Sequence, residues 1–516
     1  MNQRVWPLVL AVGMLAMPGF AQLTLSDVQT VTAQAVTRAA QVSSNSVVAI
    51  VDDEGFVLGV WSVNGSTPAT AAFTNLVADA IAKAGTASFL SSSQNAFTSR
   101  TAGFIVQQHF PPGILNTPNG PLVGVNFSNL PFSDINKLKA PGSVAIFSTT
   151  PGTAIVPVPD PVTGGLAGSP GGVPLFKNGR LVGGIGVVHT GDNPAAIQTN
   201  QVATVDEDVA LAGQTGFAPS PIYFASNVYI NGIQLPYVSS TTSLGAVIPF
   251  ASLPGANVTA YPLIAPPPPF AYPTVVLGGL TNEIRQPITS DPIAGTINGQ
   301  PRLTAAEVTN ILALAADRSR TTRAGIRLPR GQVARVFITV VNNPNSNGVP
   351  PTVLGTIRTP GATMFSWDVA VQKARTAVFY SATNRAYSTR TVGFLGQSLY
   401  PPGITGTEPG LFFGMQERFS MFQGTNPVDG AVVTNTPALD PNLPNGITIF
   451  PGGFPLYRNG VLIGAIGVSG DGVDQDDLIA ASGTMNFPAP NAIRADQDFY
   501  RSARLPYAKF PRNPAL

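Results

Sequence analysis

The feature that most constrains the fold of this chain is an internal repeat. Four sequence blocks of the first half return in the second half in the same order, and the first three return at one constant spacing. The paired blocks are 83–87 and 373–377 (KAGTA, KARTA), 99–104 and 389–394 (SRTAGF, TRTVGF), 111–114 and 401–404 (PPGI, PPGI), and 170–179 and 451–460 (PGGVPLFKNG, PGGFPLYRNG). Such ordered self-similarity predicts two copies of one domain.

Each copy has the same predicted order of helix, hairpin, helix, long loop, hairpin and helix. Capping boxes at Thr24/Asp27 and Thr304/Glu307 begin the first helices, and Asn-Gly turns mark the last hairpins. The expected elements of copy one are strands 47–51 and 56–61, helix 71–90, hairpin 173–188 and a helix from 206; those of copy two are strands 333–341 and 353–357, helix 366–382, hairpin 454–468 and a helix from 474. This order predicts an α+β fold, an α/β sandwich with helices packed on an antiparallel sheet in each copy.

Composition excludes several classes of protein. Only 10% of the 516 residues are charged and the net charge is +2, so no strong field attracts nucleic acid or anionic lipid. The absence of cysteine excludes disulfides, thiolate metal sites and covalent c-type haem attachment. Stability must therefore come from packing, and we expect a protein partner or a second copy in a homo-oligomer to add to it.

The N-terminal segment 1–21 has the pattern of a secretory signal peptide. Arg4 precedes an apolar run from Trp6 to Met17, and small residues stand at Gly19 and Ala21. The run is shorter than the ~20 residues of a membrane span, and no later stretch is long enough to span. We therefore expect a cleaved signal and a periplasmic or extracellular protein that does not cross the membrane.

The domain boundaries follow from the repeat. They predict a signal peptide at 1–21, domain 1 at 22–220, a partly structured Pro-rich connector at 221–300, domain 2 at 301–490 and a C-terminal arm at 491–516. The connector holds four consecutive prolines at 266–269, which favour a stiff extended chain. Its Ile230-Asn231-Gly232-Ile233 segment is a hairpin signal.

The combined motifs resemble the GlcG/HbpS-type haem-binding family, which also forms the C-terminal domain of PduO-type proteins. Copy two carries the resemblance through 368–377 (DVAVQKARTA), 452–456 (GGFPL), 459–470 (NGVLIGAIGVSG) and 474–476 (DQD), and copy one through 51–55 (VDDEG) and 183–187 (GGIGV). The resemblance implies two tandem profilin-like domains, frequent oligomerisation, and binding of haem or a related tetrapyrrole in some members. Copy two departs from the family at Asn342 and Asn343, which replace the early acidic pair.

The two histidines are the candidate haem ligands, because imidazole commonly binds haem iron. His109 follows the second helix and precedes Phe110, while His189 ends the late strand; we single out His109 as the candidate metal ligand. The alternative is that each is an ordinary surface or loop histidine. Copy two has Leu399 and Gly470 at these positions, so only copy one can bind haem axially through histidine; Tyr380, Tyr387, Tyr400 or Met415 could serve in copy two.

Four cationic residues recur in pairs, Arg100 with Arg390 and Lys83 with Lys373. Cations near a pocket can pair with haem propionates, so these four complete the predicted cofactor-binding set. The alternative is that they cap helices or brace the long loop.

Other motifs predict structure and carry no chemistry. Gly183–Gly186 and its counterpart lack the full dinucleotide pattern and predict a closely packed strand. The acidic run from Asp471 to Asp477 misses the calcium-loop template and predicts a solvated helix start. With no catalytic residues identified, we expect a non-enzymatic haem- or tetrapyrrole-binding protein. The rivals are a structural or accessory subunit of a larger assembly and, last, a haem-degrading enzyme.

Overall fold

The structure is a computed structural model that describes residues 22–68, 70–107, 109–114, 117–123, 125, 166–189, 201–266, 272–325, 332–416, 424–425, 432–433 and 440–509. The predicted signal peptide and most of the four-proline run lie outside these residues. No helix in the described part of the chain is long and apolar enough to cross a membrane.

The same order of elements occurs twice along the chain. The first half contains α1 (Leu25–Val42), β1 (Val47–Asp52), β2 (Val57–Ser62), α2 (Ala71–Phe89), α3 (Ser99–Ile105), β3 (Gly172–Lys177), β4 (Arg180–Val188) and α6 (Val205–Gly213). The second contains α7 (Ala305–Thr321), β12 (Phe337–Asn342), β13 (Val353–Arg358), α8 (Phe365–Phe379), α9 (Thr389–Leu395), β16 (Gly453–Arg458), β17 (Val461–Ser469) and α11 (Val473–Gly483). Helices packed on antiparallel sheets confirm the predicted α+β fold class.

Each half is built on one antiparallel sheet, and the segment between the halves adds strands to both. The strand orders are β3-β4-β1-β2-β7 and β16-β17-β12-β13-β9-β8. The added edge strands are β7 (Ala256–Asn257), β8 (Thr274–Leu277) and β9 (Leu280–Gln286). The β8–β9 hairpin, which turns at Gly278 and Gly279, was not predicted. Short pairs outside the sheets are β10 (Thr296–Ile297) with β11 (Gln300–Pro301) and β14 (Gly424–Thr425) with β15 (Val432–Val433).

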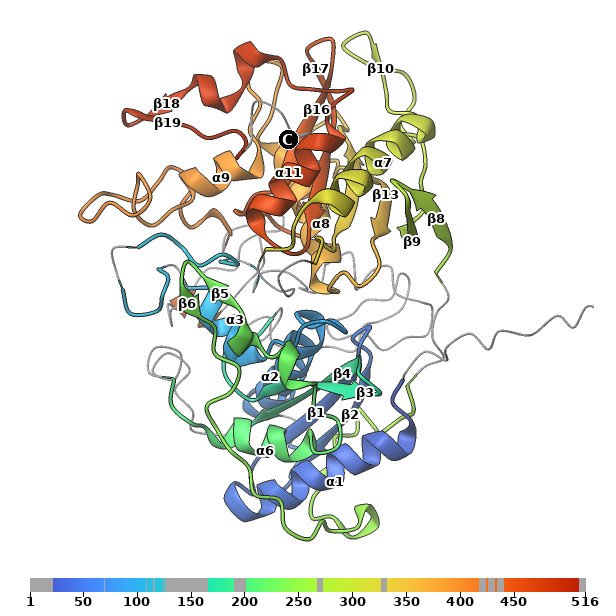
Figure 1. Ribbon diagram of the computed structural model, residues 1–516, viewed down its shortest axis with the longest axis vertical. Coiled ribbons are helices and arrows are strands. Elements are labelled where there is room, and N and C mark those ends of the chain that lie inside the picture. The colour runs from blue at the N-terminus through green and yellow to red at the C-terminus, as the bar shows by residue number, and fades with distance from the viewer. Residues whose placement is uncertain are drawn as a thin grey trace, which may run out of the picture.

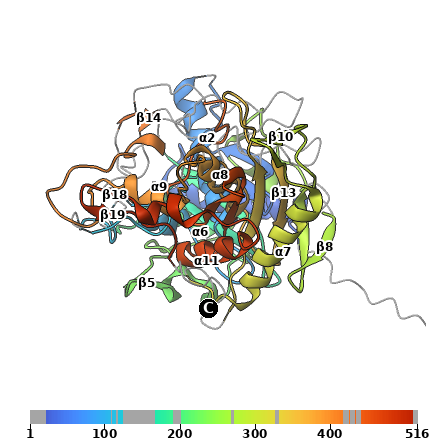
Figure 2. The ribbon, with the colours of Figure 1, turned by 90° about the horizontal axis from the view of Figure 1, so that it is seen from above.

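Helices cover both faces of each sheet (Figure 1). In β1, the alternate residues Val47, Ala49 and Val51 pack in the cluster that contains α2 side chains, while Val48 and Ile50 pack with α1 and α6. This is the two-residue period of a strand that is buried on both faces. The second half repeats the layers, and Figure 2 shows α7 and α11 lying together on one side of its sheet.

The predicted helix starts and the closely packed glycine strand are confirmed. Thr24 and Asp27 form a capping box at α1, and Thr304 and Glu307 form one at α7. In β4, a Cβ on Gly186 would lie 2.1 Å from the carbonyl oxygen of Ala80 in α2, so only glycine permits this approach of helix to strand.

Two local predictions were wrong. Where a loop was expected after the second helix, α3 and α9 form, each begun by a hydroxyl cap: Thr98 at α3 and Ser388 at α9. The caps satisfy backbone N–H groups that would otherwise have no partner. Strand β12 begins at Phe337, four residues after the predicted start at Val333, because Val333 instead forms an isolated bridge with Arg323.

The segments 221–237 and 491–507, which the sequence assigned to the connector and the arm, form the same structure in the two halves. The first contains the turns η3 (Pro221–Tyr223) and η4 (Ala225–Asn227) and the strands β5 (Tyr229–Ile230) and β6 (Ile233–Gln234), and the second contains η6 (Asn491–Ile493), η7 (Ala495–Gln497), β18 (Phe499–Tyr500) and β19 (Ala503–Arg504). We call these segments the arms. Another short turn, η5 (Phe250–Ser252), follows the first arm.

Each arm docks on the short helix of its own half through equivalent hydrogen bonds. The Thr101 hydroxyl of α3 donates to the carbonyl oxygen of Pro236 at 2.7 Å, and the Thr391 hydroxyl of α9 donates to that of Pro506 at 2.7 Å. Both contacts end in a Leu-Pro-Tyr segment whose leucine and tyrosine are buried.

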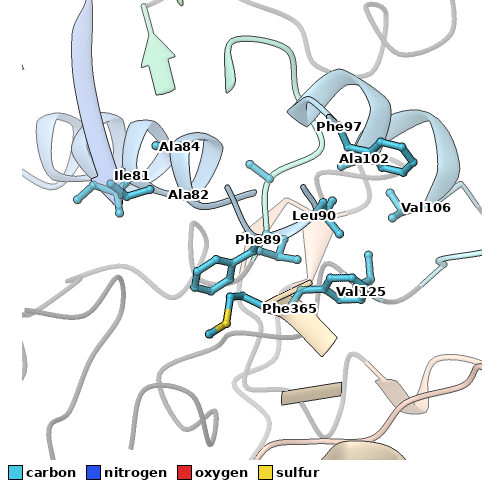
Figure 3. Close-up of a cluster of buried hydrophobic side chains, with 14 of the residues drawn as sticks. Ile81, Ala82, Ala84, Phe89, Leu90, Phe97, Ala102, Val106, Val125 and Phe365 are labelled. Carbon is cyan, nitrogen blue, oxygen red and sulfur yellow. The ribbon is translucent and has the colours of Figure 1, made fainter. Parts of the chain in front are cut away.

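The two halves pack against each other through a shared apolar cluster. Figure 3 shows Phe89 of α2 and Val125 of the first half beside Phe365 of α8. Elsewhere, Arg285 of β9 donates two hydrogen bonds of 2.9 Å to Glu54, in the turn between β1 and β2. The contact thus combines apolar packing with a bidentate ion pair.

Candidate functional site

A buried ion-pair network lies where α2, β4 and α6 meet. The Lys83 ammonium lies 2.8 Å from Oδ2 of Asp206 and donates at 3.1 Å to the carbonyl oxygen of Val187. Nδ1 of His189 lies 2.7 Å from Oδ1 of the same aspartate. Burial alone would raise the pKa of Asp206, but Lys83 and His189 outweigh it and hold the pKa below its usual range. The aspartate is therefore an anion shared by both predicted site residues.

The second half repeats this network without the histidine. The Lys373 ammonium lies 2.8 Å from Oδ2 of Asp476 and donates at 2.7 Å to the carbonyl oxygen of Val468. Gly470 occupies the position of His189. The ion pair is therefore common to both halves, and the imidazole belongs to the first alone.

The two paired arginines bind the next acidic residue of the same helices. Arg100 donates to Glu207 at 2.7 and 3.0 Å, and both side chains are almost fully buried. Arg390 donates to Asp477 at 2.9 Å and to Asp474 at 2.7 Å. Burial raises the pKa of Asp477, while Arg390 opposes that shift.

The predicted solvated helix start is wrong for most of the acidic run. Asp471, Asp476 and Asp477 are buried, and only Asp474 retains substantial exposure. Asp476 pairs with Lys373 and Asp477 pairs with Arg390, so an ion pair replaces the water around each of these two carboxylates. No group of His, Asp and Glu in the described residues has the arrangement of a metal site.

His109 lies apart from this network, on the loop that follows α3. Its ring is half-buried, and Nδ1 lies 2.9 Å from the carbonyl oxygen of Thr117. Because a carbonyl can only accept, Nδ1 carries the proton, and in the neutral ring Nε2 keeps its lone pair. The adjacent Phe110 is buried against Phe104 in an edge-to-face contact with centroids 5.6 Å apart. The loop thus fixes both the tautomer and the backbone of the histidine.

The alternative ligands of the second half are held by other contacts. The Tyr380 hydroxyl donates to Sδ of Met415 at 3.3 Å, and burial raises the pKa of Tyr380. Tyr400 packs edge-on against Phe394 and Tyr500, and burial raises its pKa also. Both phenols are therefore neutral at physiological pH. Tyr387 is only partly buried, and burial raises its pKa as well.

The structure thus divides the predicted site residues into two groups. Lys83 and His189 meet on one aspartate, while Lys373, Arg100 and Arg390 each bind carboxylates of α6 or α11. His109 makes no hydrogen bond or ion pair with these groups within the described part of the chain. Sequence reasoning noticed the acidic runs at 206–208 and 474–477 but missed that they are the partners of the recurring cations.

Comparison with known proteins identifies a similarity in the second half. Residues 332–484 match the family model described as haem degrading protein HbpS-like. An uncharacterized 15.0 kDa protein of the dhaT-dhaS intergenic region of Citrobacter freundii is 45% identical over 60 residues, which are 11% of this chain and 42% of that protein. The match thus spans less than half the length of this relative.

Several solved structures are also similar. The PduOC–haem complex is 24% identical and covers 37% of this chain and 99% of its own, with a TM-score of 0.22. Protein ORFY of Klebsiella pneumoniae is 21% identical, with 38% and 95% covered and a TM-score of 0.23. A double mutant of Streptomyces reticuli HbpS is 19% identical, with 38% and 97% covered and a TM-score of 0.22. By the match to the family model, residues 332–484, which run from just before β12 to the end of α11, are similar to the HbpS-like family.

Proposed function

We propose that the chain is an exported, non-enzymatic protein that binds haem or a related tetrapyrrole through His109. The observation that carries the proposal is the hydrogen bond between Nδ1 of His109 and the carbonyl oxygen of Thr117. Metal-binding histidines usually donate their second ring N–H to a carbonyl or carboxylate, which fixes the ring and increases the basicity of the other nitrogen. The similarity of residues 332–484 to a haem-related family supports haem, or a related tetrapyrrole, as the bound molecule.

His109 fits the role of an iron ligand better than His189 does. Nδ1 of His189 is bound to a carboxylate that also pairs with Lys83, and the aspartate is buried. Binding iron there would bring a further cation beside Lys83. At His109 the group bound to Nδ1 is a neutral carbonyl, and the ring is half-buried on a surface loop. When bound, haem would supply the iron centre, while the protein would supply the imidazole and fix its direction.

Lys83, Lys373, Arg100 and Arg390 have a different role in this proposal. Each is an internal cation that joins its helix to the first turn of α6 or α11. We assign them the bracing role and not the binding of propionates, because a second anion would have to compete with a carboxylate already at 2.7–2.9 Å.

We further propose that the two halves are tandem copies of one domain that pack as a pseudo-dimer, with each arm belonging to its own copy. The equivalent networks at Lys83 and Lys373 and the equivalent docking of the arms support this. Within such a pair, only the first copy has the histidine ligand, so the proposal predicts one haem per chain.

Haem titration tests the ligand assignment. Mature protein is titrated with haemin while the Soret band is recorded, for wild type, His109→Ala and the matched control His189→Ala. We expect a saturable red-shifted band at one equivalent in wild type and in His189→Ala. His109→Ala should bind at least about tenfold more weakly, the scale on which altered ligand surroundings weaken metal sites. An equal, weak, non-saturable band in all three proteins would overturn the proposal.

Export has its own test. The full-length chain is expressed in a bacterium, cell fractions are separated, and the N-terminus of the recovered protein is sequenced. We expect the mature protein to begin at Gln22 and to be found outside the cytoplasm. A cytoplasmic product that still begins at Met1 would contradict the export proposal and leave the haem titration unaffected.

A second candidate function is that of a structural or accessory subunit. The arms and the neighbouring Pro-Pro-Gly loops carry exposed apolar side chains, among them Ile222 and Tyr229 in one arm and Phe499 in the other. Exposed apolar surface of this kind favours contact with a partner. A failed haem titration together with a stable co-purifying protein, lost in a Tyr229→Ser/Phe499→Ser variant, would favour this function. Time-dependent loss of the Soret band with reductant would instead favour haem degradation.

A further inference from the structure

A small apolar pocket lies in the first half, and neither of the two histidines of the sequence lines it. It has a volume of about 270 Å³ and is formed by the loop after β2, the first turns of α2 and the segment that follows β7. Its lining residues are Thr67, Pro68, Phe73, Thr74, Val77, Ala78 and the run 258–261. No lining residue is charged, and the polar side chains among the lining residues are those of three threonines and Tyr261.

The second half shows what fills the equivalent place. Val77 precedes Lys83 in α2 by the same number of residues as Trp367 precedes Lys373 in α8. The Trp367 side chain is fully buried and stacks on Phe337, with centroids 6.1 Å apart and planes at 11°. Phe337 is the first residue of β12, and the first residue of β1 is Val47. The first half therefore has valine at both positions where the second has an aromatic ring.

The edge-strand segment beside this position is equivalent in the two halves as well. In the first half, the connector pairs with β2, and Val258 donates through its backbone N–H to the carbonyl oxygen of Val60. In the second half, β9 pairs with β13, and its Arg285 lies 5.4 Å from the ring of Trp367. The same helix position and the edge-strand segment thus lie beside a pocket in the first half and beside an indole ring in the second.

We propose that this pocket binds a small, uncharged aromatic molecule of about the size of indole. A small aromatic molecule bound there would remove apolar surface of both partners from water, which favours binding. The Tyr261 hydroxyl makes no hydrogen bond within the described part of the chain, so it can bind one polar atom of the guest. The volume lies below the roughly 300–1,000 Å³ of pockets for drug-sized ligands, so the pocket excludes a tetrapyrrole. The inference is therefore independent of the proposed haem site.

Indole itself is the probe. Full-length mature protein is titrated with indole by isothermal calorimetry, and saturation-transfer NMR on the indole resonances reports contact. We expect saturable binding with one site per chain. Val77→Trp, which copies the second half, should weaken binding at least tenfold, and Trp367→Val should add a second site by opening the equivalent cavity. The control Val276→Trp places the same ring on an exposed edge strand and should leave binding unchanged.

A second filling variant guards against misfolding of Val77→Trp. Thr74→Trp places the ring at the half-exposed mouth of the pocket and should also weaken binding at least tenfold, while circular dichroism checks the fold. Wild-type protein that shows no saturable indole binding, or a folded Thr74→Trp protein that binds as wild type does, would overturn the proposal. His109→Ala should bind indole normally, which separates this pocket from the haem proposal.

Discussion

Lys83 and Asp206 form an ion pair of 2.8 Å that is almost completely removed from solvent. The aspartate lies in the first turn of α6 and the lysine lies in the middle of α2, on the other face of the sheet. The pair therefore connects the two helical layers past the end of β4, where the lysine also binds the carbonyl oxygen of Val187.

Removing one member of this pair should be far more costly than removing both. Lys83→Met leaves Asp206 as a buried anion with only His189 beside it, and we expect a loss of about 3–5 kcal/mol in the free energy of unfolding. The double variant Lys83→Met/Asp206→Leu should recover a large part of that loss. Urea unfolding of the single and double variants measures the coupling, and strictly additive losses would contradict a coupled pair.

Asp53, in the turn between β1 and β2, predicts a pH dependence of stability. Burial raises its pKa to about 7, with Glu54 adding to the shift and Arg358 and Arg285 opposing it. The unfolded value is about 3.9, so the folded state binds this proton more tightly. Its contribution to stability is therefore fully present below about pH 4 and is lost as the pH rises through 7.

The Asp53→Asn variant tests that sign. It should equal wild type near pH 4 and be more stable than wild type at pH 8, because the amide has no proton to lose. Unfolding free energies from pH 4 to pH 8 give the two slopes. Asp317→Asn, at an exposed carboxylate of α7, is the control and should keep the wild-type slope. Parallel curves for Asp53→Asn and wild type would refute the assignment.

The ion pair between the halves should contribute measurably to stability. Arg285 is buried, lies 3.6 Å above the ring of Tyr272 and binds Glu54 through two hydrogen bonds. Glu54→Gln removes the charge of one partner, and we expect a loss of about 1.5–3 kcal/mol, the range for hydrogen bonds to charged groups. Thermal unfolding followed by calorimetry measures the change.

An exposed pair offers the matched comparison. Arg320 and Asp317 are both about half exposed in α7, and Arg320→Gln should change stability by less than about 0.5 kcal/mol. If Glu54→Gln were as mild as Arg320→Gln, the bidentate contact would have no special role in joining the halves.

The arms should be integral parts of their halves. Leu235 and Leu505 occupy equivalent places and are both buried, so Leu235→Ala and Leu505→Ala should each cost about 2–5 kcal/mol. Phe499→Ala, at an exposed arm position, should change stability by less than about 0.5 kcal/mol. Limited proteolysis should cut the Leu505→Ala arm faster than wild type. Near-neutral leucine variants would show that the arms are appendages.

Much of the fold could be predicted from the sequence because the signals are local. The capping boxes at Thr24 and Thr304 and the Asn-Gly turns set the ends of helices and strands within a few residues. The edge strand β7 could not be predicted in this way. The pairing of β7 with β2, far earlier in the chain, depends on tertiary contact, and its two residues carry no strand period of their own.

The site was less accessible to sequence reasoning. The repeat identified Lys83, Lys373, Arg100 and Arg390 as candidate site residues. Their charge alone does not show whether such a cation binds a ligand or forms an ion pair with a carboxylate of the same chain. The distinguishing facts are the short distances to Asp206, Asp476, Glu207 and Asp477. The apolar pocket could not be predicted for a related reason. In the sequence, Val77 is an ordinary apolar helix residue, and only the comparison with Trp367 at the equivalent position indicates that a larger side chain fits there.

The pairing of two similar halves within one polypeptide also removes a restriction that symmetric assemblies obey. In a twofold dimer of identical subunits, every side chain appears twice, and a substitution that suits one side is imposed on the other. Here the position equivalent to His109 in the second half is not a histidine, and Val77 can remain small while Trp367 is large. One half is thus free to specialise while the other keeps the packing that both require.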